Sequence, residues 1–82
     1  MSKEIEQMIA LTRQQQIDRL RIHYPVGTRL ELVEMDDSQA PPIGTHGTVL
    51  GVDDMANILV EWDNGSSLNL IPNVDRWRKL TP

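Results

Sequence analysis

Apolar and polar residues alternate along the chain after Pro25, and glycine or proline interrupts the alternation every few residues. Alternation places successive side chains on opposite faces of a strand, whereas glycine and proline are typical of turns. The pattern predicts strands at 26–35, 44–52, 57–62, 66–71 and 76–80. It also predicts a turn at 53–56 and a tight helical turn at 72–75, so the region as a whole is mainly β.

The segment WDNGSS at 62–67 lies between two of these apolar stretches and predicts a β-hairpin. A two-residue Asn64-Gly65 turn would put Leu68 and Leu70 on the face opposite Trp62. A three-residue loop that ends on Gly65 at positive φ avoids this split, because it pairs Trp62 with residue 66. We therefore expect the three-residue loop. It gathers five apolar residues on one face: Ile58, Val60, Trp62, Leu68 and Leu70.

The chain before Pro25 has a different pattern, since residues 2–22 contain no glycine or proline and consist mostly of good helix formers. Polar Thr12 and Gln16 interrupt its apolar stripe. The sequence predicts a helix over 2–22, which ends before Tyr24-Pro25 because a residue preceding proline is disfavoured in the α region. We expect the second half to dock on the β-region, and the first half either to pack on a partner or to fray. The stripe consists of Ile5, Met8, Ile9, Ile17 and Leu20.

Short antiparallel strands with a tight turn before the last one match a small SH3-like barrel, whose closure removes exposed sheet edges. The expected fold is therefore an N-terminal α-helix at 1–23 followed by a five-stranded antiparallel SH3-like barrel at 24–82. An open five-stranded sheet capped by the helix is the structural alternative.

Composition and charge narrow the functional classes. The 82 residues include no cysteine and carry a net charge of −4, and residues 24–82 hold nine carboxylates against four lysines and arginines. Such an acidic body is not typical of a general duplex-DNA binder, which relies on phosphate neutralisation. No apolar run approaches the length of a membrane span or a secretory signal, so we expect a cytoplasmic protein with no membrane association.

Several short motifs together resemble a known family: YPVGTR at 24–29, MDD at 35–37, APPIGT at 40–45, GTV at 47–49, VDD at 52–54 and WDNGSSL at 62–68. The span 20–80 resembles a family of small domains of unknown function that is common in phages, plasmids and integrated mobile elements of Gram-positive bacteria. This resemblance implies an SH3-like β-fold and a mobile-element setting, without an established activity.

The pairs Asp36-Asp37 and Asp53-Asp54 contain the oxygen ligands that Mg²⁺ and Ca²⁺ prefer, but neither has the spacing of a calcium loop. Turn chemistry explains them better, because aspartate carboxylates accept hydrogen bonds from nearby loop amides. His23 and His46 stand apart from other ligands. We therefore expect no metal site and no cofactor.

Ser66 and Ser67 lack the positioned base and oxyanion site that would activate a nucleophile, and they fit a turn-flanking role. No glycine-rich loop precedes a helix, so a phosphate cradle of the P-loop kind is absent from the sequence. The chain is therefore expected not to be an enzyme.

The leading functional hypothesis is a non-catalytic binding module of a phage or mobile element that acts on a protein partner. An acidic surface of this kind fits a basic host protein such as a defence factor. The residues expected to frame it are Met35, Asp36, Asp37, Pro41, Pro42, Asp53 and Asp54.

Two alternatives stay open. Single-stranded nucleic acid or a nucleotide could bind where cations and an aromatic ring interleave, at Arg76, Trp77, Arg78 and Lys79, although burial of Trp77 would remove the stacking surface. A homo-oligomer could form through the N-terminal helix, where Ile5, Met8 and Ile9 would pair between chains.

Overall fold

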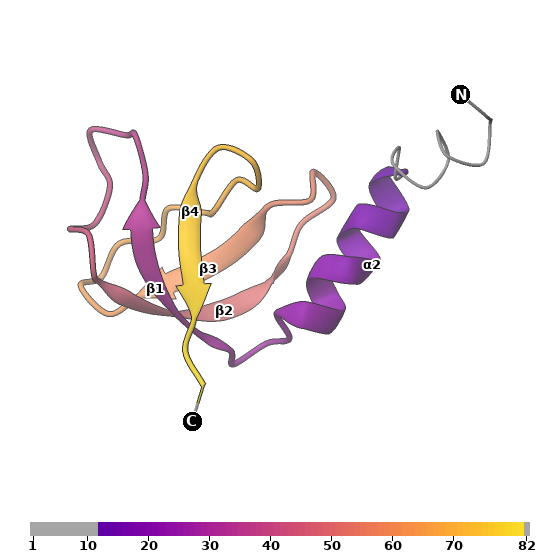
Figure 1. The fold of residues 1–82 in the computed structure, drawn as a ribbon, viewed down its shortest axis with the longest axis horizontal. Coiled ribbons are helices and arrows are strands. Elements are labelled where there is room, and N and C mark those ends of the chain that lie inside the picture. Colours follow the sequence, from indigo (N-terminus) through magenta and orange to yellow (C-terminus); the bar gives the residue numbers. More distant parts are fainter. Residues whose placement is uncertain (1–11, 82) are drawn as a thin grey trace.

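The computed structural model describes residues 12–81, which form one helix followed by a four-stranded antiparallel sheet (Figure 1). The strand order in the sheet is β3-β2-β1-β4. The fold is mainly β, as the sequence predicts, and the sheet is not closed. The elements are α2 (Arg13–His23), β1 (Arg29–Glu34), β2 (His46–Val52), β3 (Ile58–Trp62) and β4 (Arg76–Lys79).

Helix α2 begins at a capping box. The Thr12 hydroxyl accepts a hydrogen bond from the Gln15 amide at 3.1 Å, and the Gln15 side chain accepts one from the Thr12 amide at 3.0 Å. The sequence interpretation took Thr12 only as a break in the apolar stripe. The predicted helix before Thr12, and with it the self-association stripe of Ile5, Met8 and Ile9, lies outside the described residues. The predicted end is confirmed, since Tyr24 caps the helix immediately before Pro25.

The second half of the predicted helix docks on the β-region, as expected. Ile17 is buried against Val52 and Ala56, and Leu20 contacts both this cluster and the main core. Within residues 12–81, no helix has the length and the apolar composition that crossing a membrane requires.

The hairpin after β3 has the predicted three-residue loop. The Trp62 amide donates to the Ser66 carbonyl at 3.0 Å, the Gly65 amide donates to the Trp62 carbonyl at 2.9 Å, and Gly65 has a φ of +89°. Further along, Ile58 and Leu70 exchange both backbone hydrogen bonds at 2.9 Å. This is the register in which the apolar side chains share one face.

The predicted strand at 66–71 is reduced to the single bridge between Ile58 and Leu70. Between the two paired ends, the backbone of Leu68 bonds to side chains instead of Val60: its carbonyl accepts from the Trp62 indole N–H at 2.8 Å, and its amide donates to the Ser66 hydroxyl at 3.4 Å. Side-chain partners compete with a strand ladder in this way. The expected five-stranded barrel is therefore not confirmed, and the sheet has four strands.

Strands β1 and β2 begin two to three residues later than predicted, because each follows a glycine at positive φ: Gly27 at +93° and Gly44 at +90°. Both glycines lie in tight turns that the left-handed conformation permits. The turn at 53–56 and the tight turn at 72–75 are confirmed, and β4 lies within the predicted strand at 76–80.

The core lies between the curved halves of the sheet, where β1 and β4 cross in front of β2 and β3 (Figure 1). Trp62 is its largest side chain and is 1% exposed. Gly47 lies beneath it, and a Cβ built there would stand 2.7 Å from the Trp62 ring and 2.6 Å from a Val60 methyl. The main cluster consists of Leu30, Leu32, Val49, Ile58, Val60, Trp62 and Leu70.

Candidate binding surfaces

Two groups of ion-paired side chains lie on the outer face of the sheet. Arg29 holds the Asp63 carboxylate with two nitrogens, at 2.8 and 2.6 Å, and also donates to the Thr48 hydroxyl at 2.9 Å. Glu31 accepts from Arg78 at 2.8 and 3.2 Å and contacts His46 Nε2 at 3.1 Å. These ion pairs tie the hairpin loop and β4 to β1.

The ion pairs also set the acidity of their members. Hydrogen bonds from Arg78 and then from His46 hold the pKa of Glu31 below its ordinary value. The hydrogen bond from Arg29 lowers the pKa of Asp63 in the same way. Both carboxylates are partly open to solvent and already compensated, so neither Glu31 nor Asp63 supplies free charge.

The last residue of β1 and the loop that follows it carry carboxylates that, unlike Glu31 and Asp63, are not ion-paired within residues 12–81. Glu34, Asp36 and Asp37 are exposed, and none of them forms an ion pair with another residue in the range 12–81. Arg76 stands opposite Glu34 in the strand register without bonding to it. Met35, which lies between Glu34 and Asp36 in the sequence, turns inward and packs against the core. We call Glu34, Asp36 and Asp37 the acidic loop.

Backbone hydrogen bonds hold the acidic loop in place. The Asp37 carboxylate accepts from the Gln39 amide at 2.7 Å, and the base of the loop is closed by Leu32, which bonds to Gly44 and Thr45 at 2.8 and 2.9 Å. Two prolines are among the residues predicted to frame the binding surface. Pro41 is buried and Pro42 is exposed. Ile43 follows as a large apolar side chain that is 64% exposed.

Asp53 and Asp54 lie away from the acidic loop, because the loop precedes β2 and these residues follow it. Seven residues of strand separate the two ends by about 20 Å, and Figure 1 shows the two connections at opposite sides of the domain. The Asp53 carboxylate accepts from the amides of Met55 and Asn57 at 3.0 and 2.9 Å, which confirms its predicted turn chemistry. The structure therefore does not bring the seven predicted binding residues to a single concave surface.

The residues of the predicted nucleic-acid surface on β4 face different ways. Trp77 stands opposite Leu32 on the core side, half-buried, with its ring 5.9 Å from that of Tyr24 in an edge-on contact. Arg78 points to the outer face and pairs with Glu31, whereas Lys79 donates to the His23 carbonyl at 2.8 Å. Of these four residues, only Arg76 is exposed without a hydrogen-bond partner in the described part of the chain. The four side chains do not form a shared stacking platform.

The remaining reactive side chains serve the fold. His46 is engaged with Glu31, and the Ser66 hydroxyl accepts a hydrogen bond inside the hairpin. In the described range 12–81, no three histidine or carboxylate side chains come together as a metal site would require.

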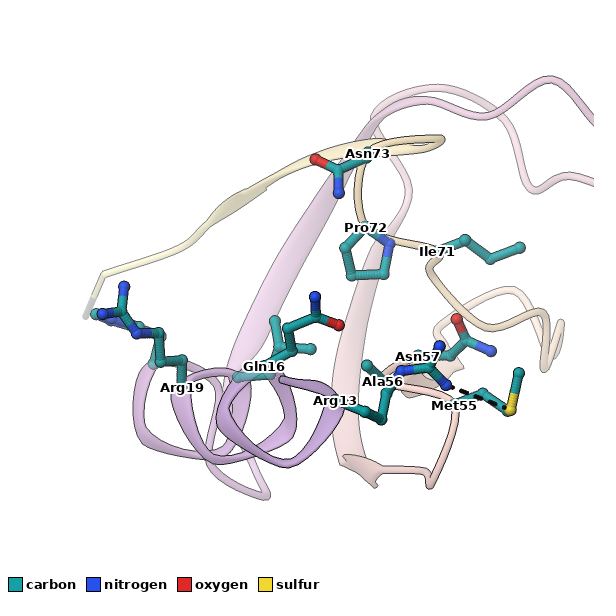
Figure 2. Close-up of a pocket in the computed structure, with 11 residues that line it drawn as sticks. Arg13, Gln16, Arg19, Met55, Ala56, Asn57, Ile71, Pro72 and Asn73 are labelled. Atoms are coloured by element: carbon teal, nitrogen blue, oxygen red, sulfur yellow. Dashed lines mark hydrogen bonds between the residues drawn. The ribbon is translucent and has the colours of Figure 1, made fainter. Parts of the chain in front are cut away.

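A groove that the sequence analysis did not identify lies between α2 and the turns at 55–57 and 71–73 (Figure 2). Its volume is about 430 Å³, and Arg13, Arg19 and His23 contribute cationic or titratable groups to its wall. The sequence does contain a signal, since positions 13, 16, 20 and 23 are three or four residues apart and share one face of a helix. In the sequence, Gln16 interrupts the apolar stripe, whereas Leu20 belongs to it.

The family described as "Domain of unknown function (DUF4314)" matches residues 13–80. The chain belongs to this family. No curated protein and no solved structure matches it. The DUF4314 match begins at the first residue of α2 and ends one residue after β4. The helix, the acidic loop and the groove are therefore all parts of the family domain, whereas the resemblance noted from the motifs began at Leu20.

Proposed function

We propose that this domain is a non-catalytic binding module of a phage or another mobile element, and that its acidic loop contacts a basic protein partner. One observation supports the proposal above others. The carboxylates of Glu31 and Asp63 are compensated by arginines, whereas those of the acidic loop are exposed and form no ion pair with residues 12–81. The mobile-element setting rests on the motif resemblance.

The chemistry of the loop fits a partner with a basic surface. Complementary charge speeds encounter and disfavours wrong partners, and a host defence protein that binds nucleic acid presents cations of this kind. Exposed Pro42 and Ile43 lie in the same β1–β2 connection and supply apolar area that contact would remove from water. The loop would then compete with phosphates for the partner's cations.

The strand order supports describing the domain as an open relative of the small SH3-like barrels. Strand β4 follows the tight turn at 72–75 and returns to pair with β1, and Leu70 bridges back to β3. A continuous ladder from 66 to 71 would supply the fifth strand.

A comparative capture experiment tests the proposal. Tagged wild-type chain and the Asp36→Asn/Asp37→Asn variant would be used as baits in a lysate of the source cells, at low and at high salt. Asparagine keeps the side-chain oxygen that accepts from the Gln39 amide, so the loop keeps its turn. The matched control is Glu61→Gln, which removes an exposed carboxylate from β3.

We expect the wild type and Glu61→Gln to recover the same basic protein, and the double variant to lose it. High salt should weaken recovery, because exposed charges are screened. Recovery of no basic protein at either salt concentration would refute the proposal.

The alternative of nucleic-acid binding through β4 has less support, because Trp77 packs toward the core and Arg78 and Lys79 are already engaged. We therefore place the partner surface at the acidic loop.

A further inference from the structure

The groove beside α2 has the opposite charge from the rest of the domain. The whole chain carries a net charge of −4, yet among residues 12–81 the groove is lined by Arg13, Arg19 and His23 and by no carboxylate. Figure 2 shows Arg13 and Arg19 at the two ends of the groove, with Gln16 between them. An acidic protein therefore presents a cationic depression at the side opposite its acidic loop.

The two arginines are not neutralised by residues 12–81. Arg13 contacts the Met55 sulfur at 3.5 Å, and Arg19 is exposed without a hydrogen bond or ion pair to that part of the chain. By contrast, Arg29 and Arg78 each hold a carboxylate. Guanidinium groups are strong, forked donors to carboxylates, so the groove retains unused capacity for an anion.

Other residues that line the groove have side chains suited to binding a polypeptide. Met55 and Ile71 are 65% and 45% exposed and form an aliphatic surface, which is typical of adaptable binding sites when methionine is present. The amide side chains of Asn57 and Asn73 also line the groove and have no partner in the range 12–81. A side-chain amide both donates and accepts, as a peptide backbone does.

The spacing of the arginines indicates the form of the ligand. Six residues along a helix separate Arg13 from Arg19 by about 9 Å along the axis. Side chains on one face of an extended peptide are two residues apart, about 6.6 Å at about 3.3 Å per residue, and the long arginine side chains span the remaining distance. Within residues 12–81, no aromatic side chain lines the groove, so this part of the chain offers no platform there on which a nucleic-acid base could stack.

From these observations we propose that the groove binds an extended acidic peptide segment of a partner protein. Two carboxylates two residues apart face α2 and contact Arg13 and Arg19, the aliphatic side chain between them points to the other wall and covers Met55 and Ile71, and the Asn57 and Asn73 amides bond to the peptide backbone. This site goes beyond the proposed function, because it lies across the length of β2 from the acidic loop and selects the opposite charge. Either proposal can fail while the other stands.

The test is fluorescence anisotropy with the full chain and a labelled peptide in which one leucine separates two glutamates, flanked by glycine and serine. The control peptide carries glutamine in place of both glutamates. Arg13→Ala/Arg19→Ala is the test variant, and Arg76→Ala, an exposed arginine on β4, is its matched control. Asn73→Gly removes one amide while tolerating the φ of 70° at that position.

We expect saturable binding of the glutamate peptide, a loss of affinity of about fivefold to tenfold in the double arginine variant, and no change in Arg76→Ala. Asn73→Gly should weaken binding by about twofold to fivefold, which is the scale of one exposed neutral hydrogen bond. Circular dichroism of each variant confirms that it is folded.

Four results of the peptide titrations would overturn the proposal, and a fifth comes from a variant of the N-terminal residues. The four are absence of saturable binding, equal binding of the glutamine peptide, unchanged affinity in the double variant, and displacement of the peptide by inorganic phosphate or oligothymidylate. The last would identify a phosphate site instead. A Glu4→Gln/Glu6→Gln variant that binds the peptide at least tenfold more tightly would show that the chain's own N-terminal carboxylates occupy the groove, which would also contradict a partner segment.

Discussion

Gly47 and Trp62 show how a single residue limits the core. The side chains of Trp62 and Val60 fill the space that a Cβ at position 47 would occupy, with contacts of 2.7 and 2.6 Å. The close contact is found at Gly47, whereas a Cβ at Gly51 would meet no atom within 4 Å.

We predict that Gly47→Ala lowers the free energy of unfolding by about 1–3 kcal/mol, because overpacking forces the indole or the backbone to move. Gly51→Ala is the matched control in the same strand and should change stability by less than about 0.5 kcal/mol. Urea denaturation followed by tryptophan fluorescence measures both. Equal effects of the two substitutions would contradict the packing described around Trp62.

Trp77 carries a buried indole N–H that has no acceptor within residues 12–81. A buried donor without a partner costs about 1–3 kcal/mol. We therefore predict that Trp77→Phe leaves the free energy of unfolding nearly unchanged or raises it slightly, since the ring contact with Tyr24 remains and the unpaired donor is gone.

Trp77→Ala is the companion variant, and it should destabilise the domain by about 2–4 kcal/mol because it opens a cavity beside Leu32 and Tyr24. Thermal unfolding of both variants provides the measurement. A Trp77→Ala variant of wild-type stability would show that the residue is not part of the core and would restore the case for a stacking surface on β4.

At the scale of elements, the hairpin register followed from the sequence because its physical requirements are local. Only the three-residue loop keeps Ile58, Trp62 and Leu70 on one face, and Gly65 supplies the positive φ that this loop needs. The strand at 66–71 was predicted by the same alternation, but the Trp62 indole takes the carbonyl of Leu68. The pattern of polar and apolar residues does not predict that hydrogen bond.

The helix gives a similar contrast. Its end at Tyr24-Pro25 could be predicted from the sequence, because proline restricts the backbone of the residue before it. Its capping box, Thr12 with Gln15, was present in the sequence but was hidden within a longer run of helix formers. The apolar periodicity correctly predicted that Ile17 docks on the β-region. It did not indicate the positions of α2 that face the groove.

The ion pairs between elements predict a dependence of stability on pH. Hydrogen bonds to Arg78 and His46 hold the pKa of Glu31 below its unfolded value, and Arg29 does the same for Asp63. A depressed carboxyl pKa stabilises the folded state above the unfolded pKa and loses that effect as the pH falls through the folded pKa. The melting temperature should therefore fall below about pH 4.

Thermal melts between neutral pH and about pH 2 test this expectation. The Glu31→Gln/Asp63→Asn variant should melt at a lower temperature than wild type at neutral pH and show a smaller decrease in acid. Because all of these groups are partly exposed, added salt should reduce the difference. An identical acid dependence in the variant would show that other carboxylates are responsible.

At the scale of the whole molecule, the sequence predicted the mainly β class and the excess of carboxylates but not their spatial division. Asp36 and Asp53 look equivalent in the sequence, since each begins an Asp-Asp pair beside a strand. The intervening strand β2 carries them to opposite ends, where Asp36 stays exposed and Asp53 closes a turn. Which charges remain free is decided by tertiary contacts such as Arg29 with Asp63, which are 34 residues apart in the chain.

The domain therefore has an acidic loop before β2, and beside the turn that follows β2 it has a groove lined by Arg13 and Arg19. The ion-paired outer face of the sheet lies between them. This arrangement suits a module that contacts a basic partner at one end, and the groove proposal assigns an acidic segment to the other. Partner contact at the acidic loop is the claim on which the proposed function depends.

Site-specific photo-crosslinking in the source cells tests that claim most directly. A photoreactive residue at Gln39, which is exposed in the β1–β2 connection and uses only its backbone amide, leaves every loop carboxylate in place. The control position is exposed Ser67 in the hairpin. The account predicts one dominant adduct with a basic protein from position 39, lost in the Asp36→Asn/Asp37→Asn background and absent from position 67. No adduct from position 39, or the same adduct from both positions, would contradict it.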